Sequence, residues 1–122
     1  MSIAQNTTYS MIVAQLLENI RNQQSMNQND FLKKAGMSQS SWSRINRGIS
    51  HFTLEEMRAA CDALEVRMKN VLADADQASV LLPQEEGIHI LENLKGSENK
   101  PILPTIIAGA ALGFLVFRLL RK

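Results

Sequence analysis

Apolar residues near the start of the chain recur at the spacing of an amphipathic helix. Val13, Leu17 and Ile20 lie four and three residues apart with polar residues between them, which predicts a helix from about Tyr9 to Gln24. Three more helices are expected to follow, over about residues 28–36, 39–47 and 54–64, and a short fifth over 66–72. The pattern therefore predicts a helical domain over residues 1–73.

The three middle helices each begin after a residue that favours a helix start. Asn27, Ser38 and Thr53 carry side-chain oxygens that accept a hydrogen bond from a free backbone amide, and Thr53 with Glu56 forms a capping-box pattern. Gly36 stands where a helix should end in a left-handed turn. The pattern predicts helix, tight turn, helix. The expected core residues are Val13, Leu17, Ile20, Met26, Phe31, Leu32, Ala35, Met37, Trp42, Ile45, Leu54, Met57, Ala60, Leu64 and Leu72.

Residues 74–100 differ from the preceding part of the chain in charge. They contain two basic and six acidic residues, against eight and six in residues 1–73. We expect an acidic linker with two short apolar runs, 80–83 and 88–91. The runs predict either a β-hairpin that pairs subunits or, for the second run, a helix through Leu94. Residues 96–100 read as a flexible tether.

A strongly apolar segment follows the linker. As a helix at about 1.5 Å per residue, residues 102–120 would span roughly 28 Å, close to the bilayer core of about 30 Å. The segment is apolar on all sides, so it predicts a membrane helix over 101–122; a buried C-terminal helix and a tail lying in the membrane interface are the alternatives. Thr105, Gly109 and Gly113 lie four residues apart and predict a small-residue stripe where two membrane helices pair.

The expected location follows from this tail and from the N-terminal residues. Residues 1–8 hold no basic stretch followed by an apolar run, so no secretory signal is expected. We therefore expect a single-pass protein of the inner (cytoplasmic) membrane, with the N-terminal domain in the cytoplasm and the lipid bilayer as one partner. Arg118, Arg121 and Lys122 oppose this orientation, because basic residues prefer the cytoplasmic side.

The sequence offers no arrangement typical of a catalytic or metal site. Cys61 is the only cysteine and lies on an expected helix, where a buried thiol is the usual interpretation. His51 and His89 stand apart without neighbouring ligands. We expect no enzyme activity, no metal and no cofactor.

Residues 26–48, followed by 53–64, resemble the phage-repressor and Cro class of helix-turn-helix domains, the XRE-like kind. The caps, the turn glycine and the apolar positions match together over about residues 9–73. In that class the helix after the turn enters the major groove of double-stranded DNA. The resemblance implies that Gln39, Ser40, Ser43 and Arg44 face base edges, that Gln28 touches a phosphate and braces Gln39, and that Arg47 lies near the backbone. It also implies a homodimer on two half-sites.

The chemistry of these side chains agrees with the implied roles. A glutamine amide pairs with adenine through two hydrogen bonds, and arginine does the same with guanine. Ser38 caps a helix whose free amides and positive dipole favour a nearby phosphate. Three positions depart from the class: Leu32 replaces a small alanine, Trp42 a valine or isoleucine, and Asn46 a frequent glutamate.

We expect an all-α protein: a five-helix repressor-like bundle (1–73), an acidic linker (74–100) and a transmembrane tail (101–122). The expected function is a membrane-anchored, sequence-specific DNA-binding protein, a bacterial or phage transcriptional regulator acting as a dimer. The alternative is a membrane-tethered interaction module that uses its repressor-like domain to bind a cytoskeletal or other protein partner. The low net charge of the N-terminal domain and the three departures support this alternative.

Overall fold

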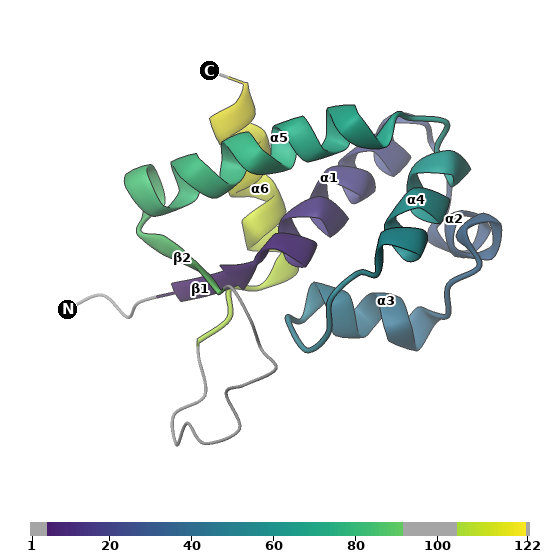
Figure 1. Ribbon diagram of the computed structural model, residues 1–122, viewed down its shortest axis with the longest axis horizontal. Helices are drawn as coiled ribbons and strands as arrows, with labels where there is room; N and C mark the ends of the chain where they lie inside the picture. Colours follow the sequence, from purple (N-terminus) through teal and green to yellow (C-terminus); the bar gives the residue numbers. More distant parts are fainter. Residues whose placement is uncertain (1–4, 92–104, 122) are drawn as a thin grey trace.

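A computed structural model describes residues 5–91 and 105–121 of the chain. The described part contains six α-helices, one π-helical turn and a two-stranded sheet (Figure 1). In chain order the elements are β1 (Gln5–Thr8), α1 (Tyr9–Gln23), α2 (Gln28–Ala35), α3 (Gln39–Asn46), α4 (Leu54–Ala63), α5 (Met68–Leu81), the π-helical turn η1 (Leu82–Glu86), β2 (Ile88–Leu91) and α6 (Gly109–Leu120).

The helix starts expected from the sequence are confirmed. The side chains of Asn27, Ser38 and Thr53 accept hydrogen bonds from backbone amides in the first turns of α2, α3 and α4, at 2.8, 3.1 and 3.0 Å. Thr53 and Glu56 complete a capping box, in which the Glu56 carboxylate accepts from the Thr53 amide at 2.9 Å. Local side-chain chemistry thus fixes where these three helices begin.

Helix α1 lies at the centre of the core. It packs against α3 on one side and against α5 and α6 on the others, while α2 packs against α4 (Figure 1). Most of the expected core is buried, with Ile20, Met26 and Leu72 partly so. Leu54 is the exception, because it is 70% exposed. It is the first residue of α4, and the buried face of that helix begins only at Met57.

Residues 74–91 are more ordered than a linker. Helix α5 continues through residue 73 to Leu81, with Val71, Ala75 and Ala78 buried on one face and Asp74 and Asp76 exposed on the other. The predicted hairpin is wrong, and so is the alternative of a helix through the second apolar run. The first run completes α5 and enters η1, whereas the second forms β2. The predicted tether over 96–100 lies outside the described residues.

The second apolar run pairs with the beginning of the chain. Strand β2 lies parallel to β1, with Gln5 opposite Ile88 and Thr8 opposite Leu91. Beyond this pair, the Asn6 amide donates to the Thr105 carbonyl at 2.7 Å, and the Ile107 amide donates to the Asn6 carbonyl at 2.9 Å. Three segments far apart in the sequence therefore meet at one end of α1.

The C-terminal apolar segment folds onto the domain. Helix α6 buries Leu112, Val116 and Leu119, which are spaced four and three residues apart, and it contacts both α1 and α5. Arg118 forms an ion pair with Glu86. No helix among the described residues has the length and apolar character needed to cross a membrane. The prediction of a membrane helix over 101–122 is thus corrected in favour of the alternative, a buried C-terminal helix; residues 101–104 and 122 lie outside the described part.

Trp42, the only tryptophan, is 3% exposed and lies in the core, as the sequence predicts. Its ring meets those of Phe31 and Phe52 edge to face, with centroids 5.2 and 6.0 Å apart. We expect Trp42→Ala to lower the free energy of unfolding by about 3–5 kcal/mol, because it leaves a cavity among these rings. Denaturant titration measures this loss, with Trp42→Phe as the milder control. A solvent-like emission maximum of the folded wild type would contradict the burial.

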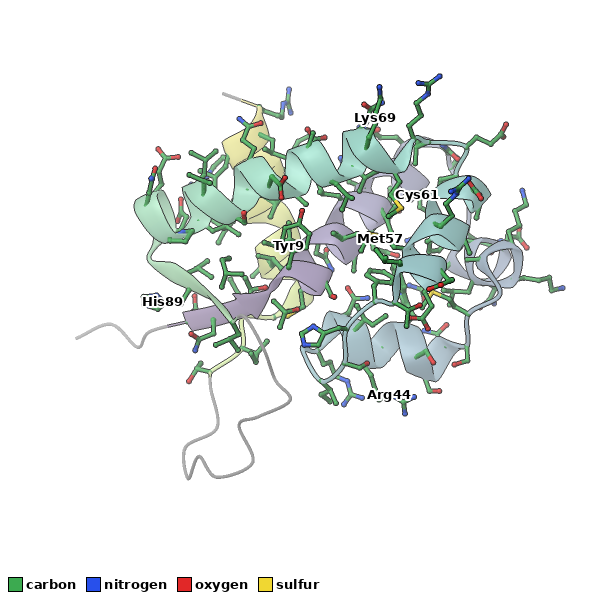
Figure 2. The ribbon with its side chains drawn as sticks, viewed as in Figure 1. Tyr9, Arg44, Met57, Cys61, Lys69 and His89 are labelled. Carbon is green, nitrogen blue, oxygen red and sulfur yellow. The ribbon has the colours of Figure 1, made fainter. Side chains whose placement is uncertain are left out.

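Tyr9 connects the first turn of α1 to α5 (Figure 2). Its hydroxyl donates to Asp76 Oδ1 at 2.6 Å, and burial, then the bond to Asp76 and its charge, raise the pKa of Tyr9 well above the ordinary value. A pKa that is higher in the folded than in the unfolded protein means that the neutral phenol stabilises the fold. Since the unfolded phenol ionises near pH 10, this contribution to the free energy of unfolding is complete below about pH 10 and is lost as pH rises above it.

We therefore expect the phenolate absorbance of folded protein to appear only well above pH 10, a clean signal because Tyr9 is the only tyrosine. Asp76→Asn should shift the titration to lower pH, since it removes the negative charge beside the hydroxyl. A phenol that titrates near its ordinary pKa in the folded wild type would contradict this account.

Candidate nucleic-acid interface

Helices α2 and α3 are joined by a tight turn that depends on one glycine. Gly36 ends α2 in the left-handed region at φ 70°, a conformation that L side chains rarely adopt. The Gly36 amide donates to the Lys33 carbonyl and the Met37 amide to the Leu32 carbonyl, at 3.2 and 3.0 Å. These two bonds cap α2 and reverse the chain so that α3 can begin at Gln39.

Helix α3 presents a polar face to solvent. Trp42 and Ile45 are buried against the rest of the domain, and Figure 2 shows Arg44 pointing away from the core. The positions predicted from the sequence to contact DNA lie on or beside this outer face. Ser38, Gln39, Ser40, Arg44 and Arg47 are exposed, whereas Gln28 and Ser43 are half-buried.

Two of these side chains hold each other in place. The Gln39 amide donates from Nε2 to Gln28 Oε1 at 3.0 Å, across the turn between α2 and α3. Beside them the Ser38 hydroxyl lies 3.0 Å from Ser41 Oγ and 3.3 Å from Ser40 Oγ. The bracing of Gln39 by Gln28 is therefore present without DNA, which reduces the side-chain entropy that Gln39 would lose on binding.

The charge around α3 favours an anionic partner locally. Residues 31–54 contain four basic residues, Lys33, Lys34, Arg44 and Arg47, and no acidic residue. Asp30 and Glu55 lie just outside this range. Although the net charge of the whole domain is modest, residues 31–54 of the helix-turn-helix form an acid-free, positively charged segment. Among the described residues, no group of three His, Cys, Asp or Glu side chains is placed to hold a metal ion.

The C-terminal end of α3 is supported by residues that sequence reasoning missed. Asn46 donates to the Trp42 carbonyl at 3.0 Å and accepts from Gln15 Nε2 of α1 at 2.7 Å. Gly48 has φ 77°, and a Cβ atom there would lie 3.2 Å from Ile106 and Met11 side-chain atoms. The available signal was Gln15, the one polar residue within the apolar run of residues 11–17.

The small residues of the C-terminal segment do not form a free stripe. Thr105 lies before α6, and its carbonyl accepts from Asn6. Gly109 and Gly113 face Gln15, since a Cβ atom added at either would lie 3.0 and 2.5 Å from the Gln15 side-chain amide. The two glycines of the predicted membrane-helix pairing stripe instead pack within the chain, because their missing side chains make room for Gln15.

A capped helix, a glycine turn and a second helix with an exposed polar face define a helix-turn-helix module, a class of DNA-binding fold. The family model described as a helix-turn-helix domain matches residues 12–73, just over half of the chain. The chain belongs to this family. A search of curated proteins found no matching relative. Membership indicates DNA binding and a role in transcription regulation.

Proposed function

We propose that this protein is a sequence-specific regulator of transcription that binds double-stranded DNA as a dimer through α3. The observation that carries the proposal is the exposed polar face of α3, whose Gln39 is held by Gln28 at 3.0 Å within an acid-free segment. This arrangement offers fixed hydrogen-bonding groups to base edges and positive charge to the flanking phosphates.

Each side chain of the interface has a proposed role. Gln39 and Arg44 read bases, because their planar groups form paired hydrogen bonds with adenine and guanine in the major groove. Ser40 and Ser43 contact neighbouring base edges. The residues proposed to contact phosphates are Gln28, Ser38 at the start of α3, and Arg47 at its end.

Substitutions on α3 should separate base reading from general affinity. With full-length protein and DNA fragments selected from a random pool, Gln39→Ala and Arg44→Ala should each cost about 1–3 kcal/mol on a preferred site and relax base preference. Arg47→Ala should weaken binding to all sequences about equally and reduce the salt dependence. Fluorescence anisotropy at several salt concentrations measures both effects.

Lys69→Ala is the matched control. It removes one exposed positive charge from α5, which lies on the opposite side of the molecule from Arg44 (Figure 2). This variant should bind like wild type. Absence of binding at low salt, or equal behaviour of all four variants, would overturn the DNA-reading role and support the alternative, a module that binds a protein partner.

The proposed dimer uses the outward face of α6. Phe114 is 67% exposed and Phe117 is also exposed, beside Ala110 and Ala111. Large aromatic residues grouped on one exposed helix face are typical of interaction surfaces. A symmetric pair would place two copies of α3 on two half-sites, so that weak binding by each domain becomes strong binding together.

Phe114→Glu should therefore shift the protein toward monomer and weaken binding to paired half-sites more than to a single half-site. The charge would have to be desolvated in the interface, which disfavours association. Leu54→Glu serves as a control, because it replaces another exposed apolar residue on α4. Sedimentation velocity measures the association. Equal masses of wild type and Phe114→Glu at every concentration would contradict this dimer surface.

A further inference from the structure

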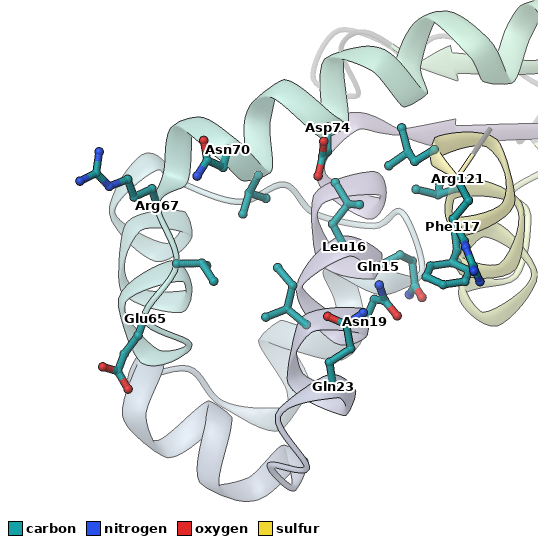
Figure 3. Close-up of a pocket in the computed structure, with 16 residues that line it drawn as sticks. Gln15, Leu16, Asn19, Gln23, Glu65, Arg67, Asn70, Asp74, Phe117 and Arg121 are labelled. Atoms are coloured by element: carbon teal, nitrogen blue, oxygen red, sulfur yellow. The ribbon is translucent and has the colours of Figure 1, made fainter.

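A pocket of about 560 Å³ lies where α6 meets the helix-turn-helix domain (Figure 3). Its walls come from α1, from the connection between α4 and α5, from α5 and from α6. Pockets that hold small organic molecules have volumes of about 300–1,000 Å³. The cavity therefore has the size for one small ligand, and it is separate from the exposed face of α3.

The chemistry of the walls selects the kind of ligand. Apolar side chains of α1 and α6 form one part of the lining: Leu16, Ile20, Val116, Phe117 and Leu120. Carboxamides form another part, with Gln15, Asn19 and Gln23 spaced four residues apart on α1 and Asn70 on α5. Such amides both donate and accept hydrogen bonds.

The carboxamides that line the pocket are free to bond to a ligand, and the lining has no excess of either charge. Among the described residues, the side-chain amides of Asn19, Gln23 and Asn70 make no hydrogen bond to another residue. The charged lining residues balance, since Glu65 and Asp74 are matched by Arg67 and Arg121. Arg121 is also placed over the Phe117 ring, 4.9 Å from its centroid. An ionic ligand would gain little from this lining.

We propose that this pocket binds a neutral, flat, amphipathic small molecule, and that its occupancy changes DNA binding through Gln15. The ring of such a ligand lies against the apolar side chains of α1 and α6, and its polar group bonds to the carboxamides. The second part of the proposal rests on the proposed function, whereas ligand binding itself does not.

Gln15 joins the pocket to α3. Its side chain lines the cavity and donates to Asn46 Oδ1 at 2.7 Å, and Asn46 donates to the Trp42 carbonyl at 3.0 Å. A ligand whose N–H or O–H group donates to Gln15 Oε1 turns the carboxamide toward the pocket and draws Nε2 away from Asn46, which removes a contact that supports the C-terminal half of α3. By linkage, DNA that favours the supported conformation of α3 lowers ligand affinity by the same factor.

The site is tested on full-length protein with N-phenyl-1-naphthylamine, a neutral aromatic amine whose emission rises in apolar surroundings. We expect saturable binding of one probe per chain. Asn70→Trp places a large ring in the pocket from an exposed position and should weaken probe binding ten-fold or more. Lys69→Trp adds the same ring at the adjacent exposed position outside the pocket and should leave it unchanged.

Circular dichroism checks that both tryptophan variants fold, and Gln23→Trp provides a second filling variant from the exposed end of α1. A non-saturable signal would overturn the site. Equal probe affinity of wild type and a folded filling variant would do the same. These measurements contain no DNA, so they test the pocket even if the proposed DNA-binding function is wrong.

The coupling is tested with Gln15→Met, which keeps the volume of the side chain and removes its hydrogen bond to Asn46. In wild type we expect saturating probe to weaken DNA binding about five-fold or more, the lower range of measured couplings. In Gln15→Met, probe binding should weaken by the loss of one hydrogen bond but remain saturable, and at saturating probe the DNA affinity should no longer respond to the probe. If wild type binds both probe and DNA independently, the coupling through Gln15 is wrong.

Discussion

The rest of the structure depends on one constraint, which is that apolar side chains on opposite faces of α1 must both be covered by other elements. Residues Met11 to Ala14 and Leu17 are fully buried, and Leu16 is nearly so. A helix that is apolar around most of its circumference must be covered on more than one face. The helix-turn-helix elements cover one side of α1, whereas α5 and α6 cover the other. The C-terminal helix is therefore part of the core that holds α3 in place.

The local features of the fold could be predicted from the sequence, because each depends on a few neighbouring residues. The caps at Asn27, Ser38 and Thr53 and the left-handed turn at Gly36 follow from side-chain and backbone chemistry within one helical turn. The extension of α5 to Leu81 was not predicted, although its signal was present, since Val71, Ala75 and Ala78 keep the helical spacing. The acidic residues between them mark the exposed face of the same helix.

The long-range features could not be predicted, because several partners compete for each apolar run. Strands β1 and β2 are four residues each and come from distant parts of the sequence, and β1 also bridges the segment around Ile106. Helix α6 reads as apolar on all sides, since Phe114 and Phe117 are exposed opposite the buried Leu112 and Val116. Hydropathy alone does not distinguish such a helix from a membrane segment. The missed signal was in α1, where Ile12 and Leu16 required a second covering layer.

The same division applies to the candidate site. The pairing of Gln28 with Gln39 could be anticipated from the resemblance, because it depends only on the geometry of the turn. The departures at Leu32 and Trp42 are accommodated in the core, Trp42 by its edge-to-face contacts with Phe31 and Phe52. The support of α3 by Gln15 could not be foreseen, because it requires α6 to dock with Gly109 and Gly113 against that side chain.

Gly48 and Gly109 allow the C-terminal segment to pack directly against the end of α3. Gly48 turns the chain after α3 at φ 77°, and its Cα lies so close to Ile106 that a Cβ atom would have only 3.2 Å of space. Gly109 lies against the Asn46 carbonyl at the end of α3, where a Cβ atom would be 3.6 Å away. Packing at this density transmits small displacements instead of absorbing them. The docking of α6 is therefore part of what holds the C-terminal end of α3, the helix proposed to read DNA, in its place.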